Sequence, residues 1–286
     1  MIRYDVRPDE LEAAIRSEVP GWLERASLRT ATLVEQCRYE ERSSIWSEVK
    51  DVFMRLQHYK CIFCERKLET KKNGRIEFDL EHFRPKGSVA VWPDGVRSVS
   101  IYDYNTGMAS SEGYYWLAYD IENYAAACKA CNTNLKLNFF PIAGERGLPT
   151  TTVAELTAEK PFLCYPLGRM DEDPSDLITF TATTAIPAQP DGHGRRRGEM
   201  IIDFFDLNRR DGLHEERARM IAIFGPALRA TSEGGGTAGE KALVQNIDSA
   251  SQPHANCLRA FRRLWNTDRV TAEDVLDHCQ ILAAEA

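Results

Sequence analysis

The chain has 286 residues, of which 43% are hydrophobic and 28% are charged, and its formal net charge is −7. These values are ordinary for one large or two modest globular domains, and no apolar run is long enough to span a bilayer. The acidic balance argues against a protein that coats nucleic acid non-specifically, because such proteins are usually basic. Between residues 61 and 141, however, ten Lys and Arg residues balance ten Asp and Glu residues, so any contact with nucleic acid is expected at a local patch or with the help of a partner.

The N-terminal region predicts helices. The segments 9–26 and 44–59 place apolar residues three and four positions apart, and Pro20 interrupts the first segment. No apolar stretch of the kind found in secretory signals precedes them, so we expect a cytoplasmic location. Residues 1–58 are therefore predicted to form an N-terminal helical region.

Two CxxC pairs form the most specific motif of the chain: Cys61 with Cys64, and Cys128 with Cys131. Each CxxC turn directs two thiolates at one point, and two turns complete the tetrahedral shell that zinc prefers. Four thiolates leave no position for water, so the zinc would be structural. A redox pair or coincidental core cysteines are the less favoured alternatives. The other cysteines are isolated and are expected in the core: Cys37, Cys164, Cys257 and Cys279.

The sequence pattern changes between the two cysteine pairs. A turn is predicted at residues 72–74, followed by a short alternating strand over Ile76, Phe78 and Leu80. Residues 85–113 are rich in Gly, Pro, Ser and Asp and predict a long loop. The second cysteine pair is expected to begin a helix.

Residues near these elements have the chemistry that phosphodiester hydrolysis requires. The reaction needs a base for water and a hard cation on the scissile phosphate. His82 is suited to be the base, because imidazole is near neutrality at cellular pH. Glu81 and Asn132 offer a carboxylate and an amide oxygen, which are ligands that Mg²⁺ or Mn²⁺ accepts. Zinc would hold the helix that carries Asn132 against the strand that ends at His82. The alternative to a catalytic role for His82 is that it is a packed, inert histidine.

The order CxxC, Glu-His, Asn, CxxC-Asn resembles the HNH (ββα-metal) endonuclease superfamily. The phrases EHFRPKG, YYWLAYDIENY and CKACNTNLKLNFFP are similar to one zinc-containing branch, the HNH component of anti-phage systems of the Septu and retron type, which works beside an ATPase. The resemblance covers roughly residues 45–220. It implies an α+β fold with a ββα-metal HNH core and a structural Cys₄ zinc, flanked by N-terminal helices and a mostly helical C-terminal region.

The resemblance also implies a role for individual residues. His82 matches the general base of the family, and Asn123 matches the middle Asn, which pins the loop and so orients the base. Asn132 matches the final metal ligand. Glu81 occupies the ligand position that is often Asp, and Asp79 is a candidate for an additional or outer metal group.

Basic residues near these positions allow two interpretations. Lys86 and Lys136 are equally compatible with phosphate contacts and with solvated surface charges. The run of arginines at 195–197 is a possible phosphate patch, although a charged loop is the commoner explanation for such a run.

The C-terminal part of the chain is less informative. Residues 177–186 predict a strand, and residues 199–208 predict either a strand or the start of a buried helix. Helices are predicted from Arg209 to Leu228 and from Ala255 to Trp265, with a flexible connector at 232–240.

These predictions divide the chain into three regions: residues 1–58, an HNH core at 59–145, and an α-rich region at 146–286 that is expected to dock a partner. The leading functional hypothesis is a metal-dependent endonuclease, with DNA favoured over RNA as the substrate and an ATPase as the partner protein. A catalytically silent, zinc-stabilised binding module is the main alternative, and a redox or metal sensor is a weaker one.

Overall fold

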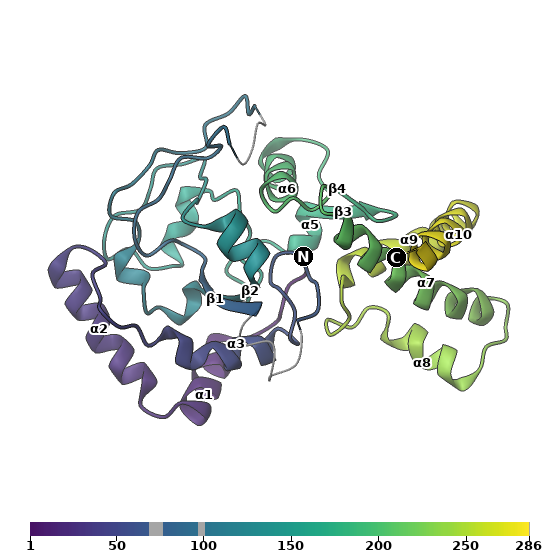
Figure 1. The fold of residues 1–286 in the computed structure, drawn as a ribbon, viewed down its shortest axis with the longest axis horizontal. Helices are drawn as coiled ribbons and strands as arrows, with labels where there is room; N and C mark the ends of the chain where they lie inside the picture. The colour runs from purple at the N-terminus through teal and green to yellow at the C-terminus, as the bar shows by residue number, and fades with distance from the viewer. Residues whose placement is uncertain (69–76, 97–100, 286) are drawn as a thin grey trace.

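The computed structural model describes residues 1–68, 77–96 and 101–285 (Figure 1). The predicted turn at 72–74 and Ile76 of the predicted strand lie outside these described residues. The described chain combines many helices with two small antiparallel sheets of two strands each. Figure 1 shows an elongated molecule, with the N-terminal helices at one end and the C-terminal helices at the other.

The N-terminal region is helical, as predicted. It consists of α1 (Pro8–Glu18), α2 (Trp22–Gln36), the 3₁₀ turn η1 (Trp46–Val49) and α3 (Lys50–Leu56). The break at Pro20 is completed by Gly21, whose φ of 75° suits a residue without a Cβ. Trp22 then begins α2 as a fully buried side chain, and its indole N–H donates to the Ile45 carbonyl at 2.9 Å. This bond fastens α2 to the segment that leads into α3.

The centre of the N-terminal half is a strand–strand–helix arrangement. Strand β1 (Phe78–His82) pairs antiparallel with β2 (Tyr124–Cys128), and the π-helix η4 (Ala130–Lys136) follows β2 at once. The predicted strand at Phe78 and Leu80 and the predicted helix after the second cysteine pair are therefore confirmed. Short 3₁₀ turns, η2 (Tyr115–Leu117) and η3 (Ile121–Asn123), lead into β2.

The middle of the chain is also partly as predicted. After η5 (Glu155–Glu159) come α5 (Pro174–Leu177), β3 (Ile178–Thr181), β4 (Thr184–Pro187) and α6 (Gly192–Phe204). The predicted single strand at 177–186 is thus a hairpin, because Ala182 adopts a positive φ of 50° and reverses the chain. Residues 195–197 lie on α6, so the charged-loop interpretation is wrong, and Arg197 is buried and paired with Asp171 at 2.8 Å.

The C-terminal helices form a second packing unit. They are α7 (Asp211–Ser232), α8 (Ala238–Asn246), α9 (Ala255–Thr267) and α10 (Arg269–Glu285). The two predicted helices correspond to α7 and α9, while α8 shortens the predicted connector and α10 extends the bundle. One cluster of buried apolar residues extends from Met1 to Leu213 and includes Ala255, and a second one lies between Ala218 and Cys279. Among the described residues, no helix is long and apolar enough to cross a membrane.

The isolated cysteines are mostly in the core, as expected. Cys164, Cys257 and Cys279 are buried, whereas Cys37 is exposed. The prediction for Cys37 is wrong because this residue follows the last turn of α2, where it caps the helix in the left-handed conformation with a φ of 53°.

Candidate functional site

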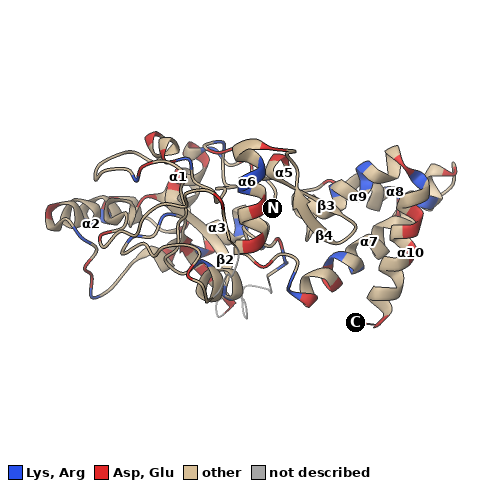
Figure 2. Ribbon diagram, turned by 90° about the horizontal axis from the view of Figure 1, so that it is seen from above, with Lys and Arg blue, Asp and Glu red and all other residues tan. Residues whose placement is uncertain are grey.

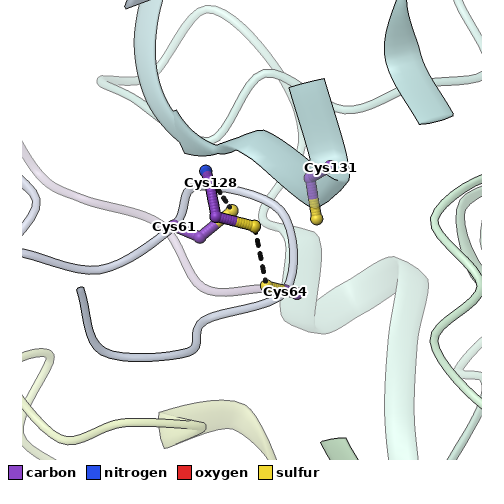
Figure 3. Close-up of side chains that lie close together, drawn as sticks. All are labelled: Cys61, Cys64, Cys128 and Cys131. Atoms are coloured by element: carbon purple, nitrogen blue, oxygen red, sulfur yellow. Dashed lines mark hydrogen bonds between the residues drawn. The ribbon is translucent and has the colours of Figure 1, made fainter. Parts of the chain in front are cut away.

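The two CxxC pairs meet in one buried cluster (Figure 3). The four sulfur atoms all lie within 4.8 Å of one another, and the sulfurs of Cys64 and Cys128 are 3.8 Å apart. Sulfurs bound tetrahedrally at about 2.3 Å from one zinc ion would be about 3.8 Å apart. The cluster therefore combines the spacing, the burial and the soft donors of a structural site that could hold a metal such as zinc.

Hydrogen bonds within the protein align the two cysteine pairs. Gln57 is fully buried just after α3, and its side chain both donates to the Ala126 carbonyl and accepts from the Ala126 N–H, each at 2.8 Å. The Ile62 N–H also donates to the Ala126 carbonyl, at 3.1 Å. The Cys128 N–H donates to the Cys61 sulfur at 3.3 Å. A metal would thus reinforce an arrangement that the backbone already favours.

The C-terminal half of the chain packs directly against this cluster. The Arg210 guanidinium donates to the Cys131 sulfur at 3.3 Å, from the segment just before α7. Phe63, inside the first CxxC turn, stacks on Phe205 with ring centroids 4.2 Å apart. Arg66 follows the same turn and forms an ion pair with Glu216 of α7. The cysteine cluster is therefore one of the places at which the two halves of the molecule meet.

The helix η4 runs along one face of β1, because two pairs of side chains connect them in register. Asn132 donates to the carboxylate of Asp79 at 3.1 Å, and the Lys136 ammonium lies 3.2 Å from the carboxylate of Glu81. Asp79 and Glu81 are two positions apart on the strand, whereas Asn132 and Lys136 are four apart on the helix. These are the spacings at which side chains of a strand and of a helix repeat on one face.

A cleft of about 530 Å³ opens beside this strand and helix. Its walls include five of the residues that the sequence singles out: Asp79, Glu81, His82, Lys86 and Asn132. Two others do not line it. Asn123 is fully buried behind the end of β1, and Lys136 is fully buried behind Glu81. Lys136 is therefore not the solvated surface charge that one interpretation of the sequence allowed.

His82 is held at the end of β1 in a defined protonation state. Its Nε2 lies 3.1 Å from the Ala118 carbonyl, and because a carbonyl only accepts, Nε2 carries the proton and Nδ1 keeps the lone pair. The rings of Trp46 and Tyr124 meet the imidazole edge to face, with centroids 4.9 and 5.0 Å away. Burial is the main cause that lowers the pKa of His82 well below its usual value, and the charge of Lys86 adds to this effect. The ring is therefore neutral at pH 7.

Glu81 and Lys136 form a buried ion pair. The side chains are 6% and 0% exposed, respectively. Burial raises the pKa of Glu81, and the Lys136 ammonium opposes this by favouring the carboxylate form. Burial also lowers the pKa of Lys136, which the Glu81 carboxylate opposes in turn. Each partner therefore depends on the other to remain charged in the interior.

Asn123 joins the chain before β2 to the chain after β1. Its side-chain oxygen accepts from the Arg84 N–H at 2.8 Å, and its amide nitrogen donates to the Arg84 carbonyl at 3.0 Å. The amide nitrogen also lies 3.3 Å from the Leu117 carbonyl. These bonds fix the backbone two residues after His82, where the long loop begins.

Replacement of Asn123 by Ala is expected to lower the free energy of unfolding by about 2–3 kcal/mol, because both backbone groups of Arg84 would lose a buried partner. Denaturant titration followed by circular dichroism measures this difference. Asn246→Ala, at an exposed position near the end of α8, is a matched control and is expected to change the stability by less than about 0.5 kcal/mol. Equal stability of the two variants would contradict this structural role of Asn123.

Three residues around the site carry no signal in the sequence. Gln57 ends a helix and looks like an ordinary surface glutamine, although both of its polar atoms bind the backbone of β2. Trp46 has the spacing of a core residue, yet it lies against His82 and lines the cleft. Arg210 is one of many arginines, and only the folded chain brings it to a cysteine sulfur. All three act through contacts distant in sequence.

No protein-family model, curated protein or solved structure matches the chain.

Proposed function

We propose that the chain is a metal-dependent HNH endonuclease that hydrolyses phosphodiester bonds of nucleic acid. The observation that carries the proposal is that His82, at the end of β1, and Asn132, on the helix after β2, line the same cleft. The cysteine cluster lies where β2 passes into that helix, so a structural zinc there would stabilise the strand–strand–helix unit. This arrangement agrees with the ββα-metal core that the sequence resemblance implies.

In this proposal the neutral ring of His82 is the general base. It takes a proton from water through Nδ1, while its Nε2–H remains bonded to the Ala118 carbonyl. Asn123 orients the base indirectly, because it fixes the backbone that follows His82. Trp46 and Tyr124 restrict the imidazole on two sides, so that rotation of the ring is limited.

The donors beside His82 fit a hard divalent cation. Asp79 and Glu81 contribute carboxylates to the cleft, and Asn132 contributes an amide. Because Asn132 donates to Asp79 through Nδ2, its Oδ1 is the atom that would bind the cation. Glu81 and Asn132 are the proposed ligands for Mg²⁺ or Mn²⁺, with Asp79 holding the Asn132 amide. A cation bound there supplies charge stabilisation on the phosphate.

The decisive experiment compares nucleic acid cleavage by the wild type and by His82→Ala in Mg²⁺ and in Mn²⁺. The wild type is expected to cleave, and the variant is expected to be slower by about 10²–10⁴-fold, which is the usual contribution of a general base. His278→Ala, at an exposed position of α10, is the matched control and should cleave like the wild type. Equal rates for the wild type and His82→Ala would overturn the assignment.

The alternative, a catalytically silent zinc-stabilised binding module, is favoured by one observation. The Glu81 carboxylate already has a cationic partner within the protein, Lys136. Titration calorimetry with Mn²⁺ separates the two functions. An endonuclease is expected to bind Mn²⁺ with an affinity that Asn132→Ala weakens, whereas a silent module should show the same response, or none, for both proteins.

The substrate and the partner are proposed from the sequence resemblance. It favours DNA over RNA, an ATPase as the partner protein, a cytoplasmic location and a role in defence against phage. The C-terminal helices α7–α10, which have a hydrophobic cluster of their own, are the proposed docking region. Native purification from cells that express the chain together with its neighbouring genes, followed by mass spectrometry, tests whether an ATPase accompanies it.

A further inference from the structure

Lys86 lies in an unusual environment at the edge of the cleft. Its ammonium is 4.5 Å from the centre of the Trp46 ring and 5.3 Å from that of Tyr39. All three residues line the cleft together with His82. Within the described parts of the chain, the Lys86 ammonium has no carboxylate as an ion-pair partner. Aromatic faces attract a cation without neutralising its charge, so this charge remains available to an anion.

Two other lysines lie close to the proposed ligands, and their ammonium groups have different contacts. Lys136 is fully buried and is paired with Glu81. Lys50 donates to the Phe78 carbonyl on β1. Lys86 differs from both, because its ammonium lies against two aromatic rings at the wall of the cleft. Burial lowers its pKa, and the charge of Glu81 raises it. Lys86 is also close enough to His82 to contribute to the lowered pKa of that ring.

The aromatic contacts restrict the side chain before any ligand binds. An unrestrained lysine side chain loses rotamer entropy when it binds a phosphate, and this loss reduces the affinity that the contact provides. Packing against Tyr39 and Trp46 removes part of this freedom in the unbound protein. Acidic and basic residues are interspersed along the ribbon in both halves of the molecule (Figure 2). In a chain of net charge −7, such a prepared cation is therefore a means of binding an anion locally.

We propose that Lys86 binds a non-bridging oxygen of the scissile phosphate and so holds the phosphodiester against His82. This inference rests on the proposed nuclease function and adds a substrate-binding residue to it. Ser88 and Asn138, which bind each other at 3.1 Å, continue the same wall of the cleft with neutral donors. A sugar–phosphate chain that passes from Lys86 along this wall would meet hydrogen-bond donors of the kind that contact nucleic acid backbones.

The test measures binding in a His82→Ala background, so that cleavage does not interfere. A fluorescent oligonucleotide is titrated in Mg²⁺ against this protein and against versions that also carry Lys86→Met or Lys86→Arg. Lys86→Met preserves the packing on the aromatic rings and removes the charge. It is expected to weaken binding about 10-fold and to reduce the salt dependence by about one phosphate contact. Lys86→Arg should retain most of the affinity, and Lys241→Met on α8, an exposed lysine, should retain all of it.

The possible results distinguish the role of Lys86 from the proposed nuclease function. Unchanged affinity of Lys86→Met at an unchanged melting temperature, or absence of binding by every variant, would overturn the role of Lys86. If the Met variant loses affinity but the wild type never cleaves, the proposed nuclease function fails while the phosphate contact stands. If the wild type cleaves and the single variant Lys86→Met, with His82 intact, cleaves equally well, the nuclease function stands and the inference about Lys86 fails.

Discussion

Removal of zinc is expected to lower the melting temperature of the protein by on the order of 10 °C or more, because a Cys₄ zinc site contributes directly to folding. The cluster connects the first CxxC turn to the junction of β2 and η4, and residues of the C-terminal half pack against it. Metal analysis should find one zinc ion per chain. Cys131→Ala is expected to lose that ion and to reproduce the low melting temperature.

Cys257→Ala is the matched control for this substitution, since Cys257 is equally buried but isolated. It should retain zinc and lose only the packing of one sulfur atom and its weak bond to the Ala182 carbonyl, at a cost of about 1 kcal/mol. If the protein contains no zinc, or if both cysteine variants melt at the same temperature, the structural metal site is wrong. Under the proposed function, loss of zinc should also abolish cleavage, because Asn132 lies on the helix that the metal would anchor.

The cysteine cluster was predictable from the sequence because its information is local. A CxxC turn brings two sulfurs together within four residues, and two such turns suggest one shared ion wherever they lie in the chain. The strand that ends at His82 was predictable for a similar reason. Alternation of apolar residues within a few positions indicates a strand without reference to the rest of the fold.

Strand β2 shows where local information is insufficient. Its centre consists of Ala125, Ala126 and Ala127, and alanine favours helices. The segment is extended because it is buried on all sides, with each alanine at most 1% exposed. The small side chains allow Gln57 to reach the backbone of Ala126 from the end of α3. The requirement for close approach comes from the tertiary structure, and it overrides the helical preference.

The position of Lys136 was not predictable for a related reason. In the sequence it is one lysine among polar residues after a CxxC pair, and nothing nearby indicates that it is buried. Its partner Glu81 lies on a strand more than fifty residues earlier in the chain. Only the packing of η4 along β1 brings the two together, and this packing depends on the cysteine cluster and on the Asn132–Asp79 contact.

Lys136→Met is expected to lower the free energy of unfolding at pH 8 by about 3–5 kcal/mol, because it leaves the Glu81 carboxylate buried without a cation. Burial already raises the pKa of Glu81, and loss of the ammonium raises it further. A carboxyl group whose pKa is raised on folding stabilises the protein below its unfolded pKa, and that stability is lost as the pH rises. The loss in free energy of unfolding caused by Lys136→Met should therefore be smaller at pH 5 than at pH 8, as measured by denaturant titration at both pH values.

The double variant Glu81→Gln/Lys136→Met separates stability from chemistry. With both charges removed, no uncompensated ion remains, and most of the lost stability should return. Arg16→Met, which breaks the exposed ion pair with Glu24, is the control and should cost less than about 1 kcal/mol. If Glu81 is a ligand of the catalytic cation, the double variant should be stable yet inactive. A stable double variant that still cleaves would show that Glu81 serves the fold alone, and the cation would then have to depend on Asp79 and Asn132.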